Sequence, residues 1–186
     1  KQCNNSKSDN YIPVSPTKLF DSRLIHSLIS LYPLNLFSPE HPLIQKTLEQ
    51  IEKNYMLNSI YFNQSTPSGF NSYHNILLAN IYVLTKNTNA FKILDWLIEY
   101  SNKAGGWPET IHPISKGGCY GEGFYGITSA EYINFIRNLL IKEDKEKLYI
   151  TPFYPKKWLS DPKMIIEAVN LPTHFGNISF KIEKKK

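Results

Sequence analysis

The sequence predicts a mainly α-helical fold of about five antiparallel helices, followed by a small C-terminal β appendage. Apolar residues recur at intervals of three and four between residues 19 and 140, as they do on the buried face of a helix. After residue 147 they alternate with polar residues, as in half-buried strands. Short connections alternate with long ones, which indicates helical hairpins whose longer loops gather on one face.

Local signals place the ends of these helices. Pro33 stops the first apolar stripe and Pro42 precedes the second, since proline is tolerated only in the first turn of a helix. Thr128 and Glu131 have the spacing of a capping box, and the charged segment 142–145 is expected to be a solvated exit from the fifth helix. The expected helices are near 19–29, 43–55, 72–84, 89–100 and 128–140, and the expected strands are 148–150, 164–169 and 178–182.

Length and composition bound the class of protein. The 186 residues, 41% of them hydrophobic, suit one domain with a sizeable core. We expect a flexible arm at 1–16, a helical region at 17–147, and a β appendage with a basic tail at 148–186. No apolar run reaches the ~18 residues of a membrane span, so no membrane partner is expected.

The net charge of +5 does not indicate a nucleic-acid partner. Only Arg23 and Arg137 are arginines, and the lysines are scattered apart from the last three residues, whereas nucleic-acid sites rely on clustered arginine. The two cysteines, Cys3 and Cys119, have no metal-binding spacing. We therefore expect no metal or cofactor, and a reducing, cytoplasmic location.

The loop between the fourth and fifth helices carries the residues best suited to chemistry. Its segments Gly105–Pro113 and Gly117–Gly123 combine glycines, an indole, an imidazole and two carboxylates. Loops longer than ~12–15 residues in a compact helical domain are usually functional. An aromatic ring beside a carboxylate is typical of a carbohydrate site.

Each candidate residue also has a purely structural interpretation. Glu109 is a candidate general base or a cap of a neighbouring turn. Glu122, between two glycines, is a second carboxylate, a sugar-hydroxyl acceptor or a solvated acid. Trp107 is a stacking platform or a core anchor. His112 binds a sugar hydroxyl, holds Glu109, or is a structural histidine.

Two tyrosines and a second long loop complete the predicted cleft. Tyr120 and Tyr125 are amphipathic and are expected to line it. The segment from 56 to 71, together with Tyr73, is expected to form the opposite wall, although Asn, Ser and Gly are also ordinary turn residues. The wall candidates are Phe62, Asn63, Ser68, Gly69, Phe70, Asn71 and Tyr73.

These motifs resemble the C-terminal part of the glucoamylase-like six-hairpin glycosidases, which have an (α/α)6 toroid. The resemblance rests on Trp107-Pro108-Glu109 with His112, on the glycine-rich turn, and on the helix opening at Thr128-Ser129-Ala130. It implies that Glu109 is the catalytic base, in the loop before the last barrel helix. Ile127 stands where the family's Thr-Trp-Ser-type motif has its tryptophan.

The resemblance extends over roughly residues 19 to 182, and Pro155, Trp158 and the segment 172–176 look like the β segment that follows the barrel in large bacterial relatives. A complete toroid has six helical hairpins, and its general acid comes from earlier in the barrel. The chain is thus expected to be a partial α/α toroid, a C-terminal fragment or a degenerate relative, inactive by itself. Exposed apolar helix faces would associate with a second copy or with a missing N-terminal half.

Three functions follow from this resemblance and remain open at this point. The first is acid/base hydrolysis of an α-glucan-like carbohydrate, with Glu109 as base and the acid outside the chain. The second is a non-catalytic carbohydrate-binding or assembly module. The third is an α/α-toroid polysaccharide lyase, in which Tyr120 and His112 would move the proton.

Overall fold

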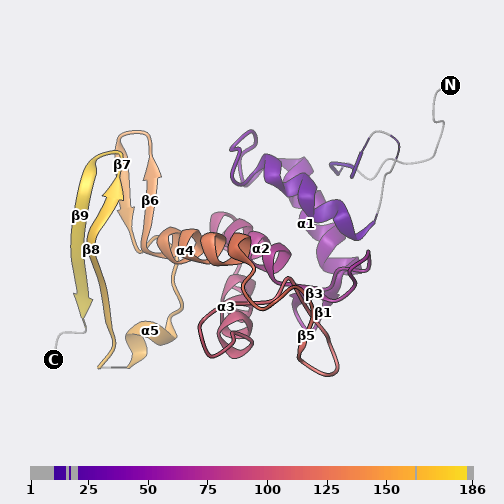
Figure 1. Ribbon diagram of the computed structural model, residues 1–186. Coiled ribbons are helices and arrows are strands. Elements are labelled where there is room, and N and C mark those ends of the chain that lie inside the picture. Colours follow the sequence, from indigo (N-terminus) through magenta and orange to yellow (C-terminus); the bar gives the residue numbers. More distant parts are fainter. Residues whose placement is uncertain (1–10, 16, 18–20, 162, 184–186) are drawn as a thin grey trace. The chain divides into compact units, whose positions relative to one another are not determined.

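The computed structural model describes residues 11–15, 17, 21–161 and 163–183 (Figure 1). Contacts divide the chain into two compact units, Lys1–Tyr132 and Ile133–Lys186, and each is described by itself. The expected boundary at residues 147 and 148 falls at the first residue of a strand in the second unit. Most of the expected arm, Cys3 and the basic tail lie outside the described residues.

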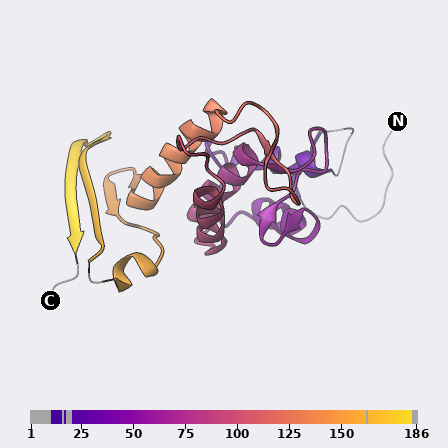
Figure 2. The same cartoon turned by 60° about the horizontal axis from the view of Figure 1, so that its bottom comes forward.

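The first unit is built from helices around α2 (Ser72–Leu84). All but two of the residues of α2 are buried, as expected for a central core helix. It packs against α3 (Asn89–Glu99) and the 3₁₀ helix η1 (Ser22–Ser30), and η1 packs against α1 (Pro42–Asn54). Figures 1 and 2 both show α2 beside α3.

Very short strands connect the loops of the first unit. Strands β1 (Met56–Leu57) and β2 (Ile60–Tyr61) form a hairpin. Strand β4 (Thr110–Ile111) is the middle strand of an antiparallel sheet, between β3 (Phe70–Asn71) and β5 (Gly118–Tyr120). This sheet joins the two long loops although they lie about 40 residues apart in sequence.

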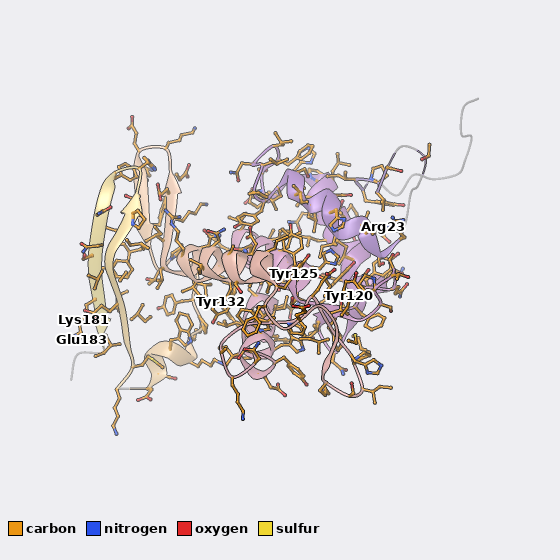
Figure 3. The ribbon with its side chains drawn as sticks, in the orientation of Figure 1. Arg23, Tyr120, Tyr125, Tyr132, Lys181 and Glu183 are labelled. Atoms are coloured by element: carbon orange, nitrogen blue, oxygen red, sulfur yellow. The ribbon has the colours of Figure 1, made fainter. Side chains whose placement is uncertain are left out.

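The described residues of the second unit form two antiparallel hairpins. Strands β6 (Ile141–Asp144) and β7 (Lys147–Ile150) form one, and β8 (Ile165–Thr173) and β9 (Gly176–Glu183) form the other. The short helix α5 (Lys157–Ser160) lies between them in sequence. Lys181 and Glu183 form an ion pair of 2.9 Å on the same face of β9 (Figure 3).

The structure confirms the predicted helices at α1, α2 and α3 and the β appendage. It differs at three places. The first helix is 3₁₀ rather than α, and Leu19 and Phe20 of its pattern lie outside the described residues. Helix α4 (Gly126–Leu140) begins two residues before Thr128, and the expected exit at 142–145 belongs mostly to β6.

The predicted capping box is also absent. Thr128 is buried inside the helix, and its hydroxyl shares a 2.8 Å hydrogen bond with the hydroxyl of Ser72. The carboxylate of Glu131 instead accepts a hydrogen bond of 3.0 Å from the hydroxyl of Tyr32. Tertiary partners therefore replace the local cap.

Candidate functional site

Glu109 is held by the first turn of α2. Its carbonyl oxygen accepts a hydrogen bond of 2.9 Å from the backbone N–H of Ser72. The hydroxyl of Ser72 donates to the carbonyl oxygen of Pro108 at 2.7 Å. Since Ser72 is fully buried, the backbone on both sides of Glu109 is fixed to the core helix.

Gly121 packs directly on the backbone of Glu109. A Cβ atom at position 121 would lie 2.9 Å from the backbone nitrogen of Glu109 and 3.2 Å from its Cβ. The φ angle of Gly121 is +83°, in the region that glycine adopts without strain. A side chain there would displace Glu109.

Asn102 closes the loop that carries Glu109. Its side-chain NH2 group donates to the carbonyl oxygen of Gly123 at 2.7 Å, and its side-chain Oδ1 accepts from the backbone N–H of Gly106 at 3.0 Å. The backbone N–H of Tyr125 donates to the carbonyl oxygen of Trp107 at 2.8 Å. The two arms of the loop are thus tied together at their bases.

Glu109 lines a cavity of about 310 Å³ in the first unit, within the usual size of small-molecule sites. Side chains from η1, from both long loops and from the start of α2 surround it. Among the described residues, Glu109 is the only carboxylate in the lining. The lining residues are Arg23, His26, Asn63, Ser65, Thr66, Pro67, Asn71, Tyr73, His74, Glu109 and Tyr125.

Two histidines of the cavity form a hydrogen-bonded pair. The Nε2 atoms of His26 and His74 lie 2.8 Å apart. Burial, and then the neighbouring His26, lowers the pKa of His74 to about 3. Burial, and then the charge of Arg23, lowers the pKa of His26. Both rings are therefore neutral near pH 7 and share one proton between the facing nitrogens.

The remaining groups of the cavity are suited to hydroxyl ligands. Burial, and then the charge of Glu109, raises the pKa of Tyr125. Burial, and then the charge of Glu131, raises the pKa of Tyr73. The phenols therefore keep their protons, and together with the amide of Asn71 they offer donors and acceptors around one carboxylate.

The structure brings Glu109 and Tyr125 together but places Trp107 in the core. Only 3% of the surface of Trp107 is exposed. Its indole N–H donates to the carbonyl oxygen of Leu97 at 2.7 Å, and its ring packs on Tyr132. The core-anchor interpretation therefore fits Trp107, and the stacking platform does not.

The other predicted site residues lie away from this cavity. Nδ1 of His112 accepts backbone N–H groups of Ile114 and Ser115 at 3.2 and 3.1 Å, so this ring shapes a turn. Tyr120 is 54% exposed on β5 (Figure 3). Glu122 lines a separate cavity. The structure therefore does not pair Glu122 with Glu109.

Of the predicted opposite wall, Asn63, Asn71 and Tyr73 line the cavity of Glu109. Arg23, His26 and His74 also line the cavity and were not predicted as site residues. One signal pointed to this place: Asn71 is the N-cap of α2, and its side chain accepts from the backbone N–H of His74 at 2.9 Å. Nothing local in η1 marks Arg23 or His26.

Two kinds of feature are absent from the part of the chain that the structure describes. No group of three or more His, Cys, Asp and Glu side chains there could hold a metal ion. No helix there is both long enough and apolar enough to cross a membrane.

Comparison with solved structures gives the class of fold. A glycosidase variant with a Phe-to-Tyr substitution matches with a TM-score of 0.55 and 15% identity, over 71% of this chain and 40% of that one. A wild-type glycosidase matches with a TM-score of 0.52 and 17% identity, over 64% and 35%. A further glycosidase variant, in complex with glucose, matches with a TM-score of 0.52 and 16% identity, over 64% of this chain and 35% of that one.

The chain therefore has the fold of a part of these glycosidases, and it spans 40% or less of their length. No protein-family model and no curated protein matches the sequence.

Proposed function

We propose that the chain is a fragment or a relative of a glycoside hydrolase, a partial α/α toroid that acts on an α-glucan-like carbohydrate, with Glu109 as the general base. The observation that carries this proposal is the cavity in which Glu109 is surrounded by phenol, amide and imidazole groups. The fold shared with part of several glycosidases supports it.

Glu109 would remove a proton from the attacking water in an inverting reaction. Such a reaction needs a second carboxyl group ~6.5–9.5 Å away, which protonates the leaving oxygen. Among the described residues no second carboxylate lines the cavity. The general acid would therefore come from outside this chain.

The test is Glu109→Gln in the protein together with any further segment that belongs to it. We expect the hydrolysis of maltotriose to fall by ~10²–10⁴-fold, with the affinity for maltotriose retained. Glu122→Gln is the matched control, because Glu122 lies in the same loop but lines another cavity. Turnover that survives in Glu109→Gln would disprove the base assignment.

The second candidate function is a carbohydrate-binding or assembly module. The lone carboxylate of the cavity favours it, because acid/base hydrolysis needs two. Such a module would bind maltotriose and release no reducing sugar, whatever chain is added. No observation favours a lyase, because Tyr120 and His112 do not line the cavity of Glu109.

We also propose that the first unit associates with a second copy or with the rest of a toroid. Phe124, just before α4, and Ile127, in its first turn, are 69% and 52% exposed. Exposed apolar groups of this kind mark association surfaces. Light scattering of the purified chain tests this. A protein that is monomeric both as wild type and as Ile127→Asp would count against self-association.

A further inference from the structure

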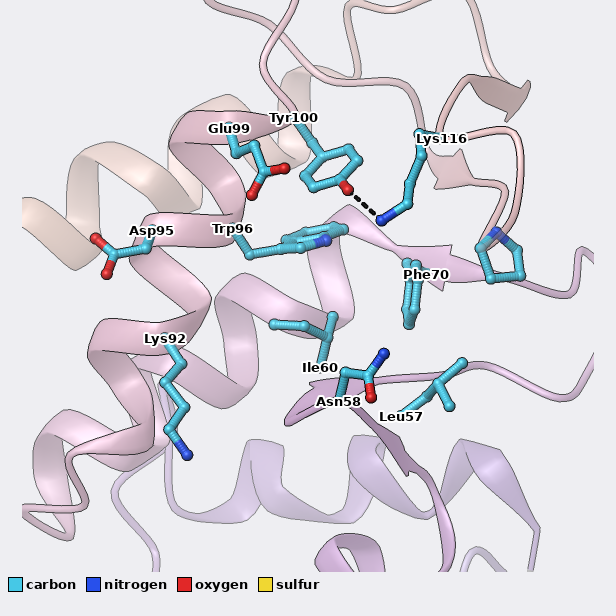
Figure 4. A pocket seen from close by; sticks show the side chains of 11 residues that line it. Leu57, Asn58, Ile60, Phe70, Lys92, Asp95, Trp96, Glu99, Tyr100 and Lys116 are labelled. Atoms are coloured by element: carbon cyan, nitrogen blue, oxygen red, sulfur yellow. Dashed lines mark hydrogen bonds between the residues drawn. The ribbon is translucent and has the colours of Figure 1, made fainter.

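A second groove lies beside α3, away from Glu109. Its walls come from α3, from the β1–β2 hairpin, from Phe70 of β3, and from the segment that follows β4 (Figure 4). Its volume is about 410 Å³. Glu109 does not line it, and none of the groove's lining residues also lines the cavity of Glu109.

Trp96 is fixed at the centre of this groove by other aromatic rings. The ring of Tyr100 stacks on it with centroids 5.5 Å apart and an angle of 25°. The ring of Phe70 meets it edge to face, with centroids 5.9 Å apart. The whole Trp96 side chain is 8% exposed, and it lines the groove (Figure 4).

The indole N–H of Trp96 is available to a ligand. Among the described residues, no acceptor is hydrogen-bonded to it, whereas the indole N–H of Trp107 is bonded to Leu97. The indole nitrogen of Trp96 points to the side where Phe70 and Lys116 lie (Figure 4). Indole groups that are mostly buried usually find a hydrogen-bond partner. An acceptor in the groove would complete this pair.

The rim of the groove carries balanced charges. Lys92, Asp95 and Glu99 on α3 are exposed, and Lys116 faces them from the loop after β4. Lys116 donates to the hydroxyl of Tyr100 at 2.5 Å. Two cations and two carboxylates give no net charge, so an anion or a cation would meet repulsion as well as attraction.

We propose that this groove is a second carbohydrate site, which holds a neutral pyranose without reacting with it. A sugar ring has an apolar C–H face for the aromatic floor and hydroxyls that both donate and accept. The rim supplies an acceptor in Glu99 and donors in the lysines. The site adds to the proposed function, and only the choice of an α-glucan as the probe rests on that function.

Indole N–H signals in nitrogen-15 NMR test the proposal directly. The chain has three tryptophans, and single Trp→Phe variants assign their signals. Maltotriose added to ~20 mM, twentyfold above a Kd of ~1 mM, should shift the signal of Trp96. The signal of the buried Trp107 should not move.

Variants separate this site from that of Glu109. Glu99→Ala should weaken the response of Trp96 at least fivefold in apparent Kd. Ile98→Ala is the matched control, because Ile98 is 58% exposed on the same helix and does not line the groove. Glu109→Gln should leave the response of Trp96 unchanged, whether or not the hydrolase proposal holds.

Two results would overturn the proposal. One is a Trp96 signal that stays fixed at ~20 mM maltotriose, against the Kd of ~1 mM expected of a weak sugar site. The other is glucose 1-phosphate shifting this signal at much lower concentration than maltotriose, which would make the groove an anion site.

Discussion

Trp107→Phe separates the core-anchor role of this residue from a role in sugar binding. Leu97 lies in the last turn of α3, where carbonyl groups have no partner within the helix. The indole N–H of Trp107 supplies that partner at 2.7 Å. Phenylalanine keeps a ring in the core but cannot donate the hydrogen bond.

The expected loss of stability has two parts. A buried carbonyl oxygen left without a partner costs ~1–3 kcal/mol. The two ring carbons that phenylalanine lacks remove about 0.8 kcal/mol each of buried apolar contact. The middle of the resulting range is about 3.6 kcal/mol. With a urea slope of ~1.5 kcal/mol per molar, the unfolding midpoint falls by about 2.4 M.

Urea unfolding followed by near-ultraviolet circular dichroism measures this change. Tyr120→Leu is the control, because Tyr120 is 54% exposed, and surface changes of this kind stay within ~0.5 kcal/mol. A loss below ~0.5 kcal/mol in Trp107→Phe, joined to a tenfold loss of sugar affinity, would refute the reasoning. Such a result would favour the interpretation of Trp107 as a platform on which a sugar stacks.

Three further predictions concern the backbone and the response to acid. Gly121→Ala should displace Glu109 and weaken maltotriose binding, and Gly105→Ala should not, because it has a similar φ of +79° but open space around its Cβ position. His74→Leu should reduce the loss of stability of the first unit as the pH falls from ~6.5 toward 3, by a slope of up to about 1.4 kcal/mol per pH unit, and the part due to His26 should remain. Glu143→Gln should destabilise the second unit at neutral pH and remove its loss of stability between about pH 4.5 and 2.

The signs of the two acid effects follow from the direction of each pKa shift. Burial lowers the pKa of His74 to about 3, so the unfolded chain takes up a proton first and stability falls with pH. The backbone N–H of His174, and then the Arg137 side chain, hold the pKa of Glu143 at about 2 although burial opposes them. That carboxylate therefore stabilises the fold above its unfolded pKa and loses this effect as the pH falls.

NMR signals of Trp107 and Trp158 report the two units separately, since the first lies in Lys1–Tyr132 and the second in Ile133–Lys186. If the stability of the first unit in His74→Leu keeps the wild-type pH dependence, His74 is not the source of the acid effect. An unchanged acid response of Trp158 in Glu143→Gln would contradict the carboxylate assignment.

Helices with local boundary signals could be predicted from the sequence. Pro42 stands at the first position of α1, and Asn71 caps α2. The strands β3 and β4 could not be predicted, because two residues each carry no periodic pattern and their pairing joins distant loops. Strand β6 could not be predicted either, because the charged segment after α4 becomes a strand only through its pairing with β7.

The candidate site was predictable where its residues lie in the two long loops or directly beside them, as Asn63, Asn71 and Tyr73 do on the opposite wall. Glu109 and Tyr125 stand in a loop whose length and composition indicate function. Composition cannot show that Trp107 turns into the core, because the decisive acceptor is Leu97 on another element. His26 and His74 contact each other because η1 packs on α2, and no local sequence pattern predicts this packing.

The two-residue strand β3 separates the two proposed sites. Phe70 lines the groove of Trp96, and its neighbour Asn71 lines the cavity of Glu109, because successive side chains of a strand point to opposite faces. Ligands bound in the two sites would therefore contact neighbouring residues of the same strand, β3. If a sugar in the groove changes the affinity of the Glu109 cavity by some factor, a sugar in that cavity must change the affinity of the groove by the same factor.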